Sequence, residues 1–127
     1  MSRAIADTSV FIAREPGRPL GELPDEIAVS VVTAAELELG VLRADDAATR
    51  AIRLATLASV RTEYPLLAID DQTASCFARI ADAELRGGRK LRRHDTWIAA
   101  TALRHGVPVL TQDPDFTAFA AVDVIHV

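Results

Sequence analysis

Hydrophobic and polar positions alternate along this chain in a way that predicts strands interleaved with helices. Short apolar runs bounded by polar or turn residues predict five strands, at residues 3–7, 27–30, 65–69, 108–111 and 122–127. Apolar residues at helical spacing predict helices at residues 33–43, 47–61, 72–85 and 95–104, with short ones through 12–13 and near 116–119. This alternation favours an α/β fold with a mostly parallel sheet and helices on both faces.

Length and composition support one globular domain spanning residues 1–127. Half of the residues are hydrophobic, which excludes a disordered chain. No apolar run approaches the roughly 20 residues of a membrane helix, so we expect no membrane association. Asp7 interrupts the N-terminal apolar run too early for a signal peptide, and Cys76 is the only cysteine. Both features predict a cytoplasmic protein without an internal disulfide.

Four acidic residues lie at or just past the starts of expected helices. They are Asp7, Glu36, Asp95 and Asp113, and three of these starts follow an expected strand directly. The carboxyl ends of parallel strands share one edge of the sheet, where α/β folds place their ligand sites. Carboxylates gathered there repel one another unless a cation holds them. The pattern therefore predicts an acidic metal pocket.

Helix capping is the competing explanation for each of these acids. Thr33 and Glu36 have the spacing of a capping box, and Pro114 after Asp113 is typical of a helix start. Asp70 and Asp71 occupy the same kind of strand-to-helix junction. Position at a junction therefore suggests a pocket without choosing its members.

A group of basic residues precedes His94 and Asp95. It comprises Arg86, Arg89, Lys90, Arg92 and Arg93. The net charge of −4 argues mildly against a general polyanion binder. The group fits either a solvated loop or a patch that contacts phosphates, because the planar fork of arginine binds phosphate in bidentate fashion. His94 is expected to be a partly exposed loop residue.

Four ordered segments resemble the motifs of the PIN domain family. They are Asp7-Thr8-Ser9, Ser30-x-x-Thr33-x-x-Glu36-Leu37-x-x-Gly40, Asp95-x-x-Ile98-Ala99-Ala100-x-Ala102 and Thr111-x-Asp113-x-Asp115-Phe116. Each segment alone is weak, but four in this order are specific, and the likeness covers essentially the whole chain. The small size of the chain most resembles the toxin of a VapBC toxin–antitoxin pair.

This resemblance implies a metal-dependent endoribonuclease that binds Mg²⁺ or Mn²⁺, cuts RNA and is silenced by a cognate antitoxin. Carried over by position, it implies that Asp7, Glu36, Asp95 and Asp113 form the catalytic and metal-binding set. Many relatives carry Asn where Asp113 stands and a second Asp before the Phe, so Asp115 is a further metal-ligand candidate. RNA is expected to approach along the Arg86–Arg93 segment. Contact with RNA is the alternative to a purely exposed loop position for His94.

The resemblance also implies an antitoxin partner and a homodimer. Apolar positions in the two helices over residues 33–61 are candidates for a groove that takes an antitoxin helix, although a core or dimer face would have the same pattern. These positions are Val41, Leu42, Ile52, Leu54 and Leu57.

Two other classes of function remain to be weighed. A non-catalytic RNA-binding or protein-binding PIN relative would keep the fold, but the four intact acids argue against it. An acidic phosphoryl-transfer domain would also place an Asp after its first strand. A receiver needs a second acid there and a Lys after a late strand, whereas Lys90 follows no strand. An Asp-x-Asp phosphatase needs a carboxylate where Ser9 stands.

Overall fold

A five-stranded parallel sheet forms the centre of the protein, in the strand order β3-β2-β1-β4-β5. The computed structural model describes residues 2–116, 119 and 121–127. The strands are β1 (Arg3–Ala6), β2 (Glu26–Ser30), β3 (Leu66–Leu67), β4 (Val109–Thr111) and β5 (Val124–His126). The predicted α/β class and the mostly parallel sheet are therefore confirmed.

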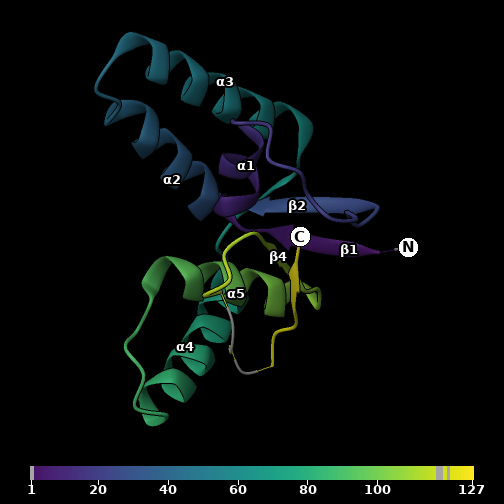
Figure 1. The fold of residues 1–127 in the computed structure, drawn as a ribbon. Helices are drawn as coiled ribbons and strands as arrows, with labels where there is room; N and C mark the ends of the chain where they lie inside the picture. The colour runs from purple at the N-terminus through teal and green to yellow at the C-terminus, as the bar shows by residue number, and fades with distance from the viewer. Residues whose placement is uncertain (1, 117–118, 120) are drawn as a thin grey trace.

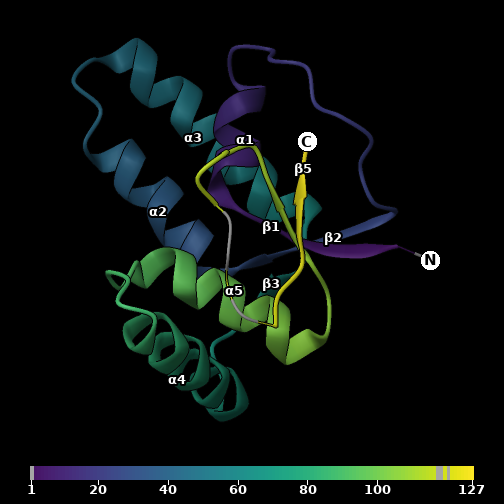
Figure 2. The ribbon, with the colours of Figure 1, turned by 60° about the horizontal axis from the view of Figure 1, so that its bottom comes forward.

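In the part of the chain that the structure describes, five helices cover the two faces of this sheet. They are α1 (Thr8–Arg14), α2 (Val31–Leu42), α3 (Ala47–Glu63), α4 (Asp71–Arg86) and α5 (Arg93–His105). Figures 1 and 2 show α1, α2 and α3 on one side of the strands and α4 and α5 on the other. The short helix expected near residues 116–119 falls partly outside the described residues.

Strand alternation divides the core into two clusters, one on each face of the sheet. Ala4 and Ala6 of β1 join the cluster under α1–α3, whereas Ile5 between them joins the cluster under α4 and α5. Leu110 and Val109 of β4 divide in the same way. The central strands are thus buried on both faces, which explains why they are nearly continuous apolar runs.

Two local expectations were wrong. The run predicted as a buried strand over residues 65–69 forms only the two-residue edge strand β3, where Leu66 is exposed. Helix α2 begins at Val31 instead of Thr33 because the Ser30 hydroxyl accepts from Val32 N at 3.1 Å and caps it. Glu36 therefore lies in the second turn of α2.

The α2–α3 pair forms an antiparallel hairpin that extends away from the sheet (Figure 1). Of the apolar positions expected to form a groove, Val41 and Leu57 belong to the core. Leu42, Ile52 and Leu54 are exposed, at 72%, 54% and 53% of their full area. Only these three fit a contact surface. Within the described chain, no helix has the length and apolar character needed to cross a membrane.

Candidate active site

Asp7 lies at the point where the strand order of the sheet reverses. Strand β1 has β2 on one side and β4 on the other, and the carboxyl ends of β1 and β4 flank the crevice that such a reversal creates. Asp7 follows β1 directly and is almost fully buried, with 5% of its area exposed. One carboxylate oxygen, Oδ1, accepts from Thr8 N at 2.8 Å, so the residue also caps α1. The capping interpretation is thus correct for Asp7, and capping does not exclude a second role.

The second oxygen of Asp7 is held by two hydroxyls from different segments. Ser9 Oγ donates to Asp7 Oδ2 at 2.8 Å, and Thr111 Oγ1 at the end of β4 donates to the same atom at 2.9 Å. Main-chain N–H groups of the next segment donate to these hydroxyl oxygens: Gln112 N to Ser9 and Asp113 N to Thr111. The segment that carries Asp113 is therefore tied to Asp7 through two hydroxyls.

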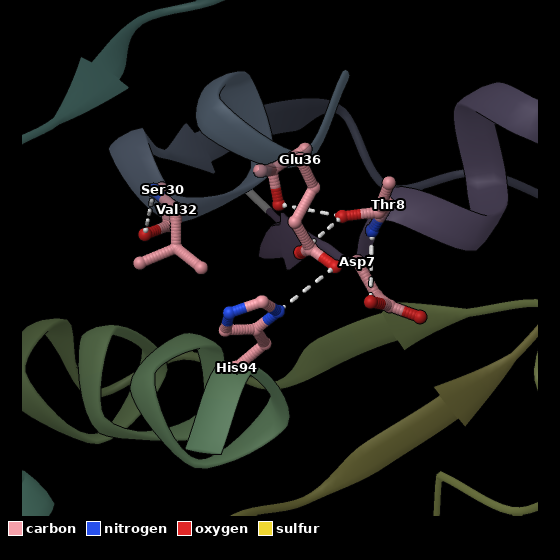
Figure 3. Close-up of polar contacts among 7 residues, drawn as sticks. Asp7, Thr8, Ser30, Val32, Glu36 and His94 are labelled. Atoms are coloured by element: carbon pink, nitrogen blue, oxygen red, sulfur yellow. Dashed lines mark hydrogen bonds and ion pairs between the residues drawn. The ribbon is translucent and has the colours of Figure 1, made fainter. Parts of the chain in front are cut away.

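Glu36 reaches the same edge of the sheet from α2. Its Oε1 accepts from Thr8 Oγ1 at 2.8 Å, and Thr8 Oγ1 also lies 3.2 Å from Thr33 Oγ1 (Figure 3). On its other side, Glu36 Oε2 lies 3.6 Å from His94 Nδ1. The competing explanation of Glu36 as part of a capping box with Thr33 therefore does not hold, because the Glu36 side chain contacts α1 and α5. His94, expected in a loop, is instead in the first turn of α5 and exposed.

Asp95 is half-buried in the first turn of α5 and does not cap that helix, whose N-cap residue is Arg92. Burial raises the pKa of its carboxyl above the ordinary value, and the negative charges of Asp7, Glu36 and Asp113 raise it further, against the opposing charge of Arg92. The four acids predicted from the sequence thus come from four separate segments and interact electrostatically.

Asp113 and Asp115 lie in a turn and have different surroundings. Asp113 is partly buried, and its Oδ1 accepts from Asp115 N at 2.9 Å. Asp115 is exposed, and its carbonyl oxygen accepts from Arg92 Nη1 at 3.1 Å. The structure brings the Asp113 carboxylate into the charge cluster around Asp95, whereas the contacts of Asp115 are made by its main chain.

The basic residues expected to act together are separated into two groups. An open depression of about 380 Å³ is lined by Arg92 and Arg93 together with Glu36, His94 and Asp95. Arg86 instead pairs with Asp82 on α4 at 2.9 Å, and Arg89 pairs with Glu84. Lys90 is exposed. Only Arg92 and Arg93 therefore line the depression beside the acids.

The donors at this edge fit a hard divalent cation. They are carboxylate oxygens, which Mg²⁺ prefers, and their repulsion adds to burial in raising the pKa of Asp95. Within the described residues, no three His, Cys, Asp or Glu side chains are grouped closely enough to hold an ion by themselves. Mg²⁺ usually takes only one or two carboxylates directly and keeps several waters, so a spaced set of acids is compatible with it.

Comparisons with known proteins agree with this architecture. The PIN domain family model matches residues 4–122. Two Mycobacterium tuberculosis proteins, ribonuclease VapC5 and ribonuclease VapC4, are 48% and 42% identical to the chain; the matches cover 97% and 98% of it, and 94% and 97% of those proteins. The crystal structure of VapBC-5 from Mycobacterium tuberculosis, a member of the VapBC family of toxin–antitoxin systems, matches with a TM-score of 0.90 at 43% identity, over 100% of both chains. The chain therefore belongs to the PIN domain family and, within it, to the VapC group.

Proposed function

We propose that this protein is a divalent-metal-dependent endoribonuclease and the toxin of a type II toxin–antitoxin pair. Mg²⁺ is the expected cofactor and Mn²⁺ a substitute, held by Asp7, Glu36, Asp95 and Asp113. The observation that carries the proposal is the convergence of acids from separate segments where the strand order reverses: Asp7 is fixed there by Ser9 and Thr111, Glu36 reaches it through Thr8, and Asp95 lines a depression together with Glu36. Burial raises the pKa of Asp95, and repulsion by the other carboxylates raises it further. Cations relieve such repulsion, and perturbed groups of this kind concentrate at functional sites.

Each acid has a definable task at this edge. Asp7 provides a rigid anchor, because both of its oxygens are fixed by hydrogen bonds. Glu36 is oriented by Thr8 on one oxygen and faces His94 with the other. Asp95 and Asp113 are partly exposed, as Glu36 is, whereas Asp7 is buried. Asp115 is the alternative fourth ligand, and its exposed carboxylate makes it the weaker candidate.

The bound metal would supply an activated water and offset negative charge on the scissile phosphate. The chain itself would hold the RNA backbone with Arg92 and Arg93, two residues that line the depression beside Asp95. His94 lies in the same depression and is available to contact a base or phosphate. The ribonuclease names of the two mycobacterial relatives support RNA as the substrate.

The direct test is RNA cleavage by Asp7→Asn and Asp95→Asn with Mg²⁺ or Mn²⁺. We expect each variant to lose at least about 100-fold in rate, since a lost ligand removes several kcal/mol of transition-state stabilisation. Asp71→Asn is the matched control, because Asp71 also lies at a strand-to-helix junction but is exposed at the start of α4. Wild-type cleavage by both site variants would exclude the mechanism, and absence of Mn²⁺ binding by calorimetry would favour a non-catalytic relative.

The antitoxin is proposed to dock on the exposed apolar residues of the α2–α3 hairpin, Leu42, Ile52 and Leu54. The relative of known structure belongs to the VapBC toxin–antitoxin family, which supports a small protein partner. Co-expression with the product of an adjacent small reading frame should yield a complex that does not cut RNA. Leu42→Glu with Ile52→Glu should release that partner, and an unchanged complex would exclude this face. The proposed homodimer is tested separately by light scattering.

A further inference from the structure

Glu84 is a fully buried acid that the proposed chemistry does not use. It lies in the last turn of α4, on the face that packs against α5, and only 2% of its area is exposed. Ile80 and Ala81 precede it by four and three residues and are buried on the same face. Helical spacing therefore puts a carboxylate at a position that belongs to the apolar stripe of α4.

Glu84 and the residue after it have the reverse of the usual burial pattern for an acid and a leucine. Leu85 follows Glu84 directly and is 57% exposed, so the helix buries its acid and exposes its leucine. Glu84 Oε1 is buried and has no hydrogen-bond partner among the described residues. Replacing a buried ion pair by apolar residues is often neutral or stabilising. Stability is thus a poor explanation for Glu84, and departures from the expected pattern concentrate at functional sites.

Arg89 folds back onto Glu84 from the loop that links α4 to α5. Its Nε donates to Glu84 Oε2, and its main-chain N donates to the Glu84 carbonyl oxygen at 3.0 Å. Gly87 makes room for the guanidinium: a Cβ at this position would lie 3.1 Å from Arg89 Cζ. We call Glu84, Gly87 and Arg89 the clasp. The ion pair and the main-chain hydrogen bond join Glu84 to Arg89, and Gly87 leaves the space that the Arg89 guanidinium occupies.

The clasp fixes the first half of a loop whose second half reaches the active site. Three residues beyond Arg89, Arg92 Nη1 donates to the Asp115 carbonyl oxygen, and its guanidinium lies 4.4 Å from the centre of the Phe119 ring. Arg92 also lines the depression beside Asp95. The loop over residues 87–92 is therefore held at α4 by the clasp and at the fourth acidic segment by Arg92.

We propose that Glu84 is a positioning residue for RNA binding, a role that rests on the proposed ribonuclease function. It binds Arg89 and thereby sets the path of residues 87–92, which presents Arg92 and Arg93 to the RNA backbone. Arg89 then serves as the counter-charge of Glu84 and not as a phosphate contact. Among the described residues, no hydrogen bond of Asp7, Glu36 or Asp113 involves Glu84 or Arg89, so we expect the metal site to survive loss of the clasp.

The test compares Glu84→Gln with Asp82→Asn. Both variants remove one negative charge from α4, and Asp82 belongs to an exposed pair with Arg86. Simple electrostatics would tighten RNA binding in both. If the clasp positions the loop, Glu84→Gln should instead raise KM for RNA about tenfold, with kcat and Mn²⁺ affinity unchanged, since small misplacements are costly for binding geometry. Asp82→Asn should leave KM equal or slightly lower.

Gly87→Ala provides a second variant that leaves both charges intact. Gly87 has φ −75°, which alanine adopts without strain, so only contact with the Arg89 guanidinium changes. It should raise KM in the same direction as Glu84→Gln. An unchanged KM in both variants, or a parallel loss of kcat and Mn²⁺ affinity, would overturn the positioning role.

Amide hydrogen exchange across residues 87–92 tests the clasp without relying on activity. Exchange should accelerate in Glu84→Gln and Gly87→Ala but not in Asp82→Asn, because only the first two loosen the loop. Unchanged exchange would overturn the clasp itself. If wild-type protein neither binds nor cuts RNA, the proposed function fails, and this measurement still decides whether Glu84 fixes the loop.

Discussion

Asp7 and Asp70 have nearly the same local structure and very different surroundings. Each follows a strand and caps the next helix: Asp7 accepts from Thr8 N at 2.8 Å, and Asp70 accepts from Thr73 N at 2.8 Å. Each also accepts from a buried threonine hydroxyl, from Thr111 for Asp7 and from Thr73 for Asp70. A local description of the chain would not separate the two acids.

Their difference comes from strand order. Asp7 follows the central strand β1 at the point where the order of the sheet reverses, and three other acids reach the same edge from α2, α5 and the segment after β4. Asp70 follows the edge strand β3 and faces a cation, with Arg104 Nε 3.5 Å from its Oδ2. A capping carboxylate thus becomes a candidate metal ligand only where the topology adds further carboxylates.

The largest difference in RNA cleavage between the two sites should appear when the threonine hydroxyl that holds each acid is removed. Thr111→Val removes the hydrogen bond to Asp7 Oδ2 and the acceptor for Asp113 N. We expect a loss of about 10- to 100-fold in kcat/KM, the range typical of residues that orient metal ligands. Thr73→Val removes the corresponding hydroxyl beside Asp70 and should leave cleavage unchanged. Steady-state RNA cleavage at saturating Mn²⁺ measures both variants, and equal losses would remove the distinction between the two sites.

A smaller difference, in the salt dependence of RNA binding, should distinguish the arginines near Asp95 from the arginine that pairs with Asp70. Arg92 and Arg93 line the depression at Asp95, whereas Arg104 pairs with Asp70. Each single-strand phosphate neutralised contributes about 0.7 to the slope of log affinity against log salt. Arg92→Glu with Arg93→Glu should therefore flatten this slope by about 1.4, and Arg104→Gln should not change it. Titration of labelled RNA without divalent metal gives the slopes; an unchanged slope in the double variant would remove Arg92 and Arg93 from the RNA site.

Sequence patterns were sufficient to predict the sheet and the convergence of the four acids at one edge, because the succession of strands and helices and the ordered motifs are both local signals. The catalytic and metal-binding roles of these acids stay a prediction. The same signals failed at β3, where an apolar run suggests burial although the strand lies at the sheet edge. They also failed at the start of α2, since Ser30 and Thr33 are both good caps and only the end of β2 decides between them.

The basic residues before α5 show a third limit of prediction from sequence, because proximity along the chain does not decide which of them face the site. Arg86 and Arg92 are close in sequence, but an acid one turn earlier on α4 pairs with Arg86, whereas Arg92 continues to the active site. Glu84 was missed because a carboxylate next to an exposed leucine has the pattern of a surface residue. Its helical spacing from Ile80 is the signal that could have identified it.

The smallest expected effect is on the pH dependence of folding stability, where Asp95 and Asp70 should contribute with opposite signs. The pKa of Asp95 is raised by burial and by the charges of Asp7, Glu36 and Asp113, so the metal-free protein loses stability as pH rises from about 4 through that raised pKa. The pKa of Asp70 is lowered, first by Thr73 N–H, then by the Thr73 hydroxyl and by Arg104. Its stabilising contribution is present above about pH 4 and is lost as pH falls through the lowered pKa.

Urea unfolding in EDTA should therefore distinguish the two acids by sign. At about pH 7, Asp95→Asn should raise the free energy of unfolding by no more than about 1 kcal/mol, because solvent screens a half-buried group. Asp70→Asn should lower that free energy, since a neutral amide is a weaker partner for Arg104. The Asp95 difference should shrink as the pH falls through the raised pKa of Asp95, whereas the Asp70 difference should persist until the pH falls through the lowered pKa of Asp70. If Asp95→Asn instead destabilises the metal-free protein at neutral pH, burial and the charges of Asp7, Glu36 and Asp113 do not disfavour the ionised Asp95, and its site does not differ in sign from that of Asp70.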